Sequence, residues 1–390
     1  MKVLFLSNLF PDAAAPIRGL DNARLLAHLR ADAQIRVLAL RPRPWLWPAA
    51  RRFEPRSEDQ WASPEFVSTP YIPKLGSRWN HRLMARALRR PLRQLRARFP
   101  FDVGLVSWLF PDGCAVAQLA CELKFPFVAI AQGSDAHLYL GMAARRDAIV
   151  RAMQHAAAVV GRSADLVRRL AAAGVSTGRL HTIYNGVDLN LYAPADPKEA
   201  RRELGLPLEG PLVLFVGNLL PIKNPLLLLE ACAPLCRSRA TPVQLVMVGE
   251  GPLRARIERT ARRLGIAATV HLAGRQPPER VARYLQAADV LALSSWNEGL
   301  PNVVLEAFAC GRPVVASRVG GLPEVITESW AGRLVNPGDA EAFRVALHEQ
   351  LAEPPQPARL RDYATRFSWP ETARAHATLL RNALAPQAVS

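Results

Sequence analysis

The sequence predicts an α/β protein with two parallel sheets, each covered by helices. Short apolar runs with the length of buried parallel strands alternate with helical segments along most of the chain. At 390 residues the chain is long for one domain and suits two. A Pro-rich, polar stretch at about residues 190–210 has the composition of a linker between them.

The first half alternates strands and helices in the order that a parallel sheet requires. A Pro- and Trp-rich segment, Arg41–Pro73, interrupts the pattern, and we expect it to pack irregularly on the surface. The expected strands are Lys2–Ser7, Gln34–Leu40, Phe101–Trp108, Pro126–Ala131, Ala157–Val160 and Leu180–Tyr184. The expected helices are Leu20–Leu29, Cys114–Leu123, Ala143–Ala156 and a segment that Ser163 caps and that runs to Ala173.

The second half repeats the alternation. Asn185–Asp188 should form a tight turn with a positive φ at Gly186 and end the first domain. A last helix, Glu371–Leu384, follows Phe367 and Trp369, which should anchor it by packing. The expected strands of this half are Pro211–Gly217, Val243–Gly249, Thr269–Ala273, Val290–Leu293, Pro313–Ser317 and Arg333–Val335.

The stretch Val290–Ser317 carries the strongest functional signal. A short apolar strand leads into a loop with glycine and proline, then a short helix, Val303–Cys310, and then a β-branched strand. We expect Asn302 to cap the helix and Gly311 to end it with a left-handed backbone. Ligands of doubly wound sheets bind where strands end and helices begin, so this junction is a candidate site.

Two carboxylates bracket that junction. Glu298 lies in the loop, and Glu306 follows eight residues later, in what should be the first turn of the helix. The backbone N–H groups of residues 299–304 offer an anion site at the helix start. Carboxylates beside an anion site suit the hydroxyls of a ribose and a hexose that are attached to phosphate. The simpler alternative is that Glu306 complements the helix dipole and Glu298 is solvated.

The segment EGLPNVVLEA resembles the E-x7-E motif of the retaining GT-B glycosyltransferases of family four, and the continuation Gly311–Ile326 is similar to the same family pattern. The resemblance covers the second half of the chain and, more weakly, the first. It implies that Glu306 holds the nucleotide ribose and that Glu298 contacts hydroxyls of the transferred sugar. The loop residues implied to bind the donor with them are Gly299, Leu300, Pro301 and Asn302.

A second helix start lies after the first strand of the second half. Asn224 can cap that helix with Pro225 at its first position, so Lys223 stands beside a positive helix end and would make a good diphosphate partner. The segment resembles the family's G-R-x4-K pattern from Gly217, but Asn218 replaces the usual arginine. One phosphate-binding cation is therefore missing.

Two further turns resemble nucleotide-binding segments of the family. Gly251 belongs to a Gly-Glu-Gly-Pro turn near the nucleotide, and Arg275 follows the next strand, in a segment that lies against the base. Ordinary turn chemistry is the open alternative for both.

On the acceptor side the resemblance points to the loop after the strand Pro126–Ala131. Gln132 stands where many members carry a histidine, and this loop faces the reacting sugar in the family. Gly133, Ser134 and Asp135 follow it, and Gly19 ends the first loop, which is usually Gly-rich and faces the acceptor.

The resemblance implies two Rossmann-like domains facing one cleft, the GT-B arrangement. The implied bounds are 1–188 for the acceptor-side domain, 189–366 for the donor-binding domain and 367–390 for a helix that returns to the first domain. The implied reaction moves a sugar, with retention, from a nucleotide-diphosphate sugar, UDP-linked by default, to an acceptor hydroxyl. Glu298, Lys223 and Gln132 would be catalytic, with no metal and no cofactor.

Other functions stay open. The chain could be a sugar-nucleotide-binding protein without activity, which the replacements at Asn218 and Gln132 favour, or a nucleotide-sugar epimerase on the same architecture. A structural protein of the membrane surface is a third alternative.

About half of the net charge of +17 lies in one segment. Lys74–Arg98 holds nine Lys and Arg and no acidic residue, on an amphipathic pattern that Pro91 is expected to break or kink. The segment is either a solvated surface helix or a patch that binds an anionic membrane. We expect a lipid-linked or glycan acceptor in cell-surface polysaccharide or glycolipid synthesis, and no nucleic acid, since no nucleic-acid motif is present.

No apolar run approaches the roughly eighteen residues of a membrane span. The five cysteines are dispersed; Cys232 and Cys236, one helical turn apart, should pack in a core. These features predict a cytoplasmic protein, peripheral on the inner face of the membrane.

Overall fold

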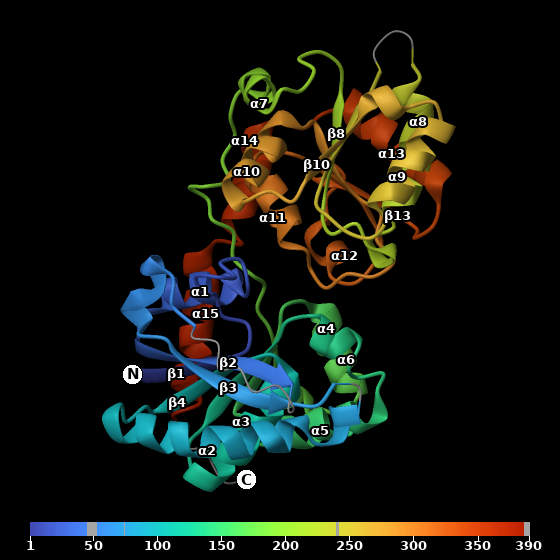
Figure 1. Ribbon diagram of the computed structural model, residues 1–390. Helices are drawn as coiled ribbons and strands as arrows, with labels where there is room; N and C mark the ends of the chain where they lie inside the picture. Colours follow the sequence, from blue (N-terminus) through green and yellow to red (C-terminus); the bar gives the residue numbers. More distant parts are fainter. Residues whose placement is uncertain (45–52, 74, 239–241, 386–390) are drawn as a thin grey trace. The chain divides into compact units, whose positions relative to one another are not determined.

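The computed structural model describes residues 1–44, 53–73, 75–238 and 242–385, and the chain forms two compact units (Figure 1). Unit 1 comprises Met1–Gly186 with Trp369–Ser390, and unit 2 comprises Val187–Ser368. Each has its own parallel sheet and helical layers, so the predicted α/β class with two Rossmann-like domains is confirmed. Trp45 and Trp47 of the predicted insertion, and Lys74 of the basic segment, lie outside the described residues.

Unit 1 is built on a seven-stranded sheet of order β3-β2-β1-β4-β5-β6-β7, in which every neighbouring pair is parallel. Its strands are β1 (Lys2–Ser7), β2 (Gln34–Pro44), β3 (Glu65–Tyr71), β4 (Val103–Ser107), β5 (Phe127–Ala131), β6 (Ala158–Gly161) and β7 (Leu180–Thr182). Its helices are α1 (Leu20–Leu29), α2 (Asn80–Arg98), α3 (Cys114–Leu123), α4 (Ser134–His137), α5 (Ala143–Met153), α6 (Ala164–Ala172) and α15 (Trp369–Asn382).

Alternation along β1 assigns the two faces of this sheet. Val3 and Phe5 pack with α1 and α15, whereas Leu4 and Leu6 pack with α2, α3 and α5 on the opposite face (Figure 1). Both faces are buried, which explains why the strands read as continuous apolar runs.

The prediction that Arg41–Pro73 is irregular is partly wrong. β2 extends to Pro44, and β3 pairs with it in parallel from Leu38↔Glu65 to Pro44↔Tyr71. β3 is the edge strand of the sheet, where a proline is tolerated because one side of the strand has no ladder hydrogen bonds. The prolines of the segment made it look irregular in the sequence. A break or kink was expected at Pro91, and the break is wrong: α2 continues through this residue, with buried Leu88 and Leu92 on either side.

Unit 2 is built on a six-stranded parallel sheet of order β10-β9-β8-β11-β12-β13. α8, α9 and α13 cover one face, and α10 and α11 contact the other with α7 and α14 outside them (Figure 1). The strands are β8 (Leu212–Val216), β9 (Gln244–Val248), β10 (Val270–Gly274), β11 (Val290–Leu293), β12 (Val314–Ser317) and β13 (Gly332–Val335). The helices are α7 (Pro197–Leu204), α8 (Pro225–Cys236), α9 (Arg254–Arg263), α10 (Pro278–Ala287), α11 (Asn302–Ala309), α12 (Leu322–Val325), α13 (Ala340–Ala352) and α14 (Pro357–Thr365).

The expected linker at residues 190–210 is instead ordered around α7. Asp196 caps this helix by accepting the Lys198 N–H, and Gly205 ends it in the left-handed conformation. Arg201, buried on its inner side, donates to the Ala287 carbonyl and pairs with Asp289 at 2.9 Å. These contacts fasten the segment to unit 2.

Gly186 does not have the positive φ expected of it. A Cβ there would lie 2.4 Å from the Trp369 ring, so glycine is needed for close packing. Cys232 and Cys236 are buried free thiols in the unit 2 core, as expected. In the described part of the chain, no helix is long and apolar enough to cross a membrane.

Candidate functional site

The loops that follow β8, β9 and β10 converge at the carboxyl edge of the unit 2 sheet. The Gly217 N–H donates to the Val248 carbonyl at 2.9 Å, and the Gly249 N–H donates to the Gly274 carbonyl at 2.8 Å. Gly249 has φ +142°, and a Cβ there would lie 1.9 Å from the Gly217 oxygen. Only glycine, which has no side chain, lets the backbones approach so closely here.

Lys223 and Glu298 meet at this edge from loops 75 residues apart. The Lys223 Nζ lies 2.6 and 2.7 Å from the two carboxylate oxygens of Glu298. The Ser295 hydroxyl donates to the same carboxylate at 2.6 Å. The lysine side chain is 26% exposed and that of the glutamate 6%, so the cation faces outward from a carboxylate that is held in place. The two residues that sequence reasoning named as catalytic in this half therefore form one ion pair.

The backbone around Glu298 is fixed by the loop after β12. The Gly321 N–H donates to the Gly299 carbonyl at 2.6 Å. A Cβ on Gly320 would lie 1.8 Å from the Glu298 carbonyl oxygen, so no other residue fits there. The Trp296 N–H donates to the Ile222 carbonyl at 2.8 Å and joins this loop to the segment that carries Lys223.

The start of α11 differs from the expectation in one respect. Asn302 is the first helical residue and Pro301 occupies the N-cap position without a side-chain cap, so the prediction of Asn302 as the cap is wrong. Glu306 therefore lies in the second turn, half-buried, and not in the first. Gly311 ends the helix with φ +73°, as expected.

Asn224 precedes α8 in the left-handed conformation and its side chain makes no capping hydrogen bond, contrary to the expectation. Asn218 lies at the surface, and the adjacent Leu219 N–H donates to the Glu250 carbonyl at 2.9 Å, next to Gly251. Arg275 is exposed beyond β10. The structure thus brings Asn218, Gly251, Lys223 and Glu298 to the same edge of unit 2.

At the carboxyl edge of unit 1, Gln132 follows β5. Its side-chain amide nitrogen donates to Asn22 Oδ1 at 3.0 Å and to the Ser107 hydroxyl at 2.7 Å. Sequence reasoning did not single out either partner. A side-chain amide can hold these two acceptors and still present its own carbonyl oxygen to a ligand.

Asp135, expected to face the acceptor, is fully buried. Its carboxylate accepts the N–H groups of Leu109, Gln132 and Gly133, each at 2.9 Å. Burial raises the pKa of Asp135, and these hydrogen bonds oppose the rise. Asp135 therefore fixes the loop that carries Gln132, while Ser134 is exposed.

Asp112 is a second buried carboxylate at this edge, and sequence reasoning missed it. Its Oδ2 accepts the Asn8 backbone N–H at 2.6 Å and the Asn8 side chain at 2.8 Å, whereas Oδ1 has no partner among the described residues. Burial raises the pKa of Asp112 to about 7. Asp112 lies five residues after the end of β4, in the turn Leu109–Gly113 before α3, and no local sequence pattern marks it as buried.

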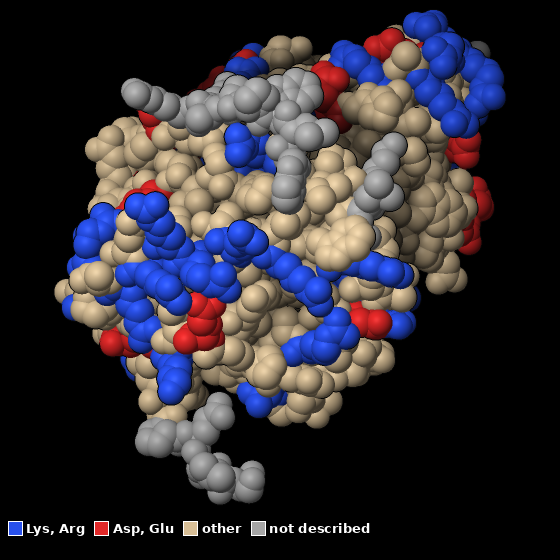
Figure 2. Space-filling model, turned by 60° about the horizontal axis from the view of Figure 1, so that its bottom comes forward, with Lys and Arg blue, Asp and Glu red and all other residues tan. Residues whose placement is uncertain are grey.

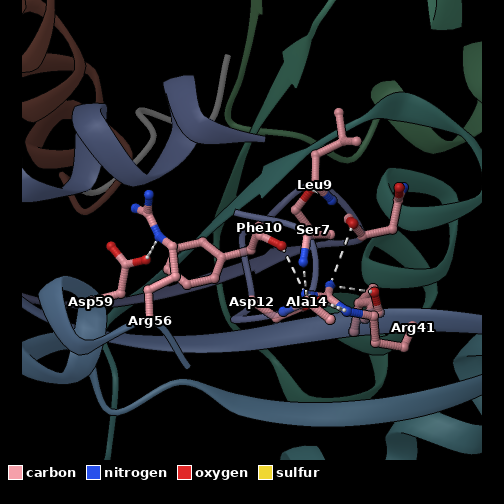
Figure 3. Close-up of polar contacts among 11 residues, drawn as sticks. Ser7, Leu9, Phe10, Asp12, Ala14, Arg41, Arg56 and Asp59 are labelled. Atoms are coloured by element: carbon pink, nitrogen blue, oxygen red, sulfur yellow. Dashed lines mark hydrogen bonds and ion pairs between the residues drawn. The ribbon is translucent and has the colours of Figure 1, made fainter. Parts of the chain in front are cut away.

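The loop between β1 and α1 is fixed to β2 by a buried ion pair. Arg41 pairs with Asp12 at 2.8 Å and donates to the Phe10 carbonyl at 2.8 Å (Figure 3). Burial lowers the pKa of Arg41, and Asp12 opposes this. Gly19, at the end of the loop, has φ +64°, and a Cβ there would lie 2.3 Å from the Leu9 carbonyl. The loop is therefore closely packed at both ends.

Two protein-family models match the chain, one over most of each unit. The family model described as "Glycosyl transferases group 1" matches residues 196–367, and that described as "Glycosyltransferase Family 4" matches residues 23–191. The chain belongs to the GT-B glycosyltransferases of family four.

Relatives of this family-four chain include proteins named D-inositol 3-phosphate glycosyltransferase. That of Segniliparus rotundus is 38% identical over 53% of this chain and 49% of its own length. That of Rhodococcus opacus is 33% identical over 69% of this chain and 63% of its own length. The chain thus spans about half the length of the first of these relatives.

Solved structures share the fold over nearly the whole chain. Sucrose-phosphate synthase from Thermosynechococcus elongatus has a TM-score of 0.78 at 22% identity, covering 99% of this chain and 100% of that one. Anabaena HepE in complex with UDP has a TM-score of 0.76 at 21% identity, covering 98% and 100%.

Proposed function

We propose that this family-four chain is a retaining glycosyltransferase that moves a sugar from a nucleotide-diphosphate sugar to an acceptor hydroxyl. The observation that carries the proposal is the Lys223–Glu298 ion pair at the carboxyl edge of unit 2, beside the start of α11. Support comes from the names of the relatives and from Anabaena HepE, a structural neighbour solved with UDP and with UDP-glucose. UDP is therefore the first nucleotide to test.

In the proposed reaction, Lys223 and the N-termini of α8 and α11 neutralise the departing diphosphate, without a metal ion. The donor phosphates would draw Lys223 partly away from Glu298, and the freed carboxylate would accept hydroxyls of the transferred sugar. Glu306, half-buried in α11, would hold the ribose. Gln132, positioned in unit 1 by Asn22 and Ser107, would contact the sugar from the acceptor side.

We also propose that the acceptor is lipid-linked or a glycan and that α2 docks unit 1 on an anionic membrane. Figure 2 shows Lys and Arg side chains gathered on the face that carries α2. Arg82, Arg86 and Arg90 are exposed at helical spacing and make no ion pair with the described residues. Arg89 and Arg93 instead share Glu122, at 2.9 and 2.6 Å, so they contribute less free charge than the sequence implied.

The test is a donor-hydrolysis screen across UDP-, GDP- and ADP-linked sugars, followed by product analysis with candidate acceptors. The proposal predicts slow hydrolysis of one nucleotide-sugar class and faster release of the nucleoside diphosphate when an acceptor hydroxyl is present. Binding of a nucleotide sugar without hydrolysis or transfer would favour the sugar-nucleotide-binding protein, for which Asn218 in place of arginine is the supporting observation.

A further inference from the structure

Arg162 lies at the carboxyl edge of unit 1, next to the loop that carries Gln132. It is the first residue after β6, and the register pairs Ala131 of β5 with Gly161 of β6. Gln132 and Arg162 are each one residue beyond that pair, so they leave neighbouring strands at the same edge. This is the edge where ligands of parallel sheets bind.

The Arg162 side chain is buried and makes no hydrogen bond with any described residue. Its residue exposure is 2%, and its Nε, Nη1 and Nη2 all lack partners among the described residues. Arg41 is equally buried, at 2%, but pairs with Asp12 and donates to three backbone carbonyls. Arg201, at 5%, is bonded to Asp289 and to backbone carbonyls. These two buried arginines are therefore hydrogen-bonded, whereas all the N–H donors of Arg162 stay open among the described residues.

One carboxylate among the described residues interacts electrostatically with Arg162, without a hydrogen bond to it. Asp21, in the first turn of α1, is the carboxylate near enough to favour its charged form. Burial lowers the pKa of Arg162 to about 10, so the guanidinium stays charged at neutral pH. His376 of α15, whose pKa burial lowers to about 3, is neutral there and its Nε2 also lacks a partner among the described residues. A buried cation without hydrogen bonds is costly unless an anion or ordered water completes its shell.

We propose that Arg162 binds a phosphate group of a ligand at the carboxyl edge of unit 1. The planar guanidinium can form two parallel hydrogen bonds to phosphate oxygens. The neighbouring loop has open space, since a Cβ on Gly133 would have no atom within 4 Å. The ligand's identity rests on the proposed function, which offers two sources: the diphosphate of the donor, or a phosphate on the acceptor.

The first experiment measures thermal unfolding against inorganic phosphate at constant ionic strength set with chloride. The wild-type midpoint should rise with phosphate concentration, as a ligand that binds the folded state requires. The Arg162→Met variant should lose this rise. Arg168→Met, which removes an exposed arginine of α6, should keep it and thereby accounts for the general stabilisation by phosphate.

Arg162→Lys keeps the positive charge but loses the planar guanidinium that can form two parallel hydrogen bonds. This variant should need a several-fold higher phosphate concentration for the same rise in the unfolding midpoint. This variant also covers the case in which the methionine variant does not fold. The proposal is overturned by no phosphate dependence in the wild type, or by an undiminished dependence in both Arg162 variants, either of which would leave Arg162 as a packing residue with bound water.

A second experiment separates the sources by titrating UDP and glycerol 3-phosphate into the wild type and the Arg162 variants. Weakened UDP binding assigns the donor, and weakened glycerol 3-phosphate binding assigns the acceptor; no change with either probe overturns the proposal. None of these measurements needs turnover, so an inactive chain that still shows an Arg162-dependent phosphate effect would refute the proposed function and keep this site.

Discussion

The carboxyl edges of the two sheets use charge in opposite ways. In unit 2, Lys223 and Glu298 form a pair whose cation is partly open to solvent. In unit 1, Asp112 and Asp135 are fully buried and hold loop backbones, and Arg162 is buried with no hydrogen bond to the described residues. The same architecture therefore carries a partly exposed cation paired with a carboxylate on one edge and fully buried charges on the other.

This difference indicates which residues a substitution can probe cleanly. A partly exposed pair can be removed at less cost to folding than a buried one, so its loss should affect ligand binding more than stability. A buried carboxylate that holds backbone N–H groups should affect folding first. The predictions below test this division.

The largest effect is expected for Lys223→Ala and Glu306→Ala. Each should lower turnover at saturating donor by about a hundredfold or more, because each removes a contact that stabilises charge in the transition state. The thermal unfolding midpoint should stay close to that of the wild type. Lys198→Ala, which removes an exposed lysine paired with Glu209, is the matched control.

Turnover near the wild-type value in either variant would contradict the assignment of this edge. A large drop in the unfolding midpoint of Lys223→Ala would instead show that the pair is structural, and the contrast between the units would disappear.

The exposed arginines of α2 come next. Replacing Arg82, Arg86 and Arg90 by Gln should weaken co-sedimentation with anionic vesicles at low salt, by at most about 1 kcal/mol per residue, and spare donor hydrolysis. The control replaces three arginines on the surface of α9, Arg256, Arg259 and Arg263, with the same loss of charge. Absent wild-type binding to anionic vesicles, or equal loss in the control, would make α2 a solvated face and favour a soluble acceptor.

Asp112→Asn tests the buried charge of unit 1. The pKa of Asp112 is raised by folding, so between about pH 4 and 7 the folded chain holds a proton that the unfolded chain has released, and stability falls as pH rises. The substitution removes that dependence, at most about 1.4 kcal/mol per pH unit. Chemical denaturation at pH 5, 6 and 7 should show that the free energy of unfolding of the variant increases relative to that of the wild type as pH rises.

The side-chain amide that Asp112→Asn introduces keeps one oxygen, which can still accept from Asn8, so the loop should survive this change. Asp147→Asn, an exposed change of the same kind, should show no such trend. Parallel pH profiles for the wild type and Asp112→Asn would mean that Asp112 is ionised throughout and that its second oxygen is satisfied.

The smallest effect is expected for Asn218→Arg. Asn218 lies at the surface, so the longer side chain has room and can add a bidentate phosphate contact. The Michaelis constant for the donor should fall several-fold with little change in turnover. A higher Michaelis constant with intact folding would show that Asn218 has another role.

Local patterns were sufficient to predict most of unit 2. The strand, loop and helix within Val290–Ser317 each have a complete local signal, and Gly311 ends the helix as its position implied. Helix α7 was predictable as well, because Asp196, Pro197 and Gly205 are start and stop signals, although the segment also has the Pro-rich composition of a linker.

What the sequence did not reveal depends on tertiary contacts. β3 is a strand only because β2 lies beside it, and Gly186 is needed because Trp369 packs against it. Asp112 and Arg162 are of interest because they are buried, and sequence periodicity does not report the burial of a polar residue beyond a strand. The candidate residues of unit 2 were therefore found by motif, whereas Asp112 and Arg162 of unit 1 needed the structure.

The measurement that tests the central claim most directly is a calorimetric titration of UDP into the wild type, Glu298→Gln and Lys223→Ala. If the Lys223–Glu298 pair is the donor-phosphate site, UDP should bind the wild type and bind Lys223→Ala at least about tenfold more weakly. It should bind Glu298→Gln as well as or better than the wild type, because the lysine is released from its carboxylate. Equal affinity for all three proteins, or no binding to a folded wild-type protein, would contradict the account.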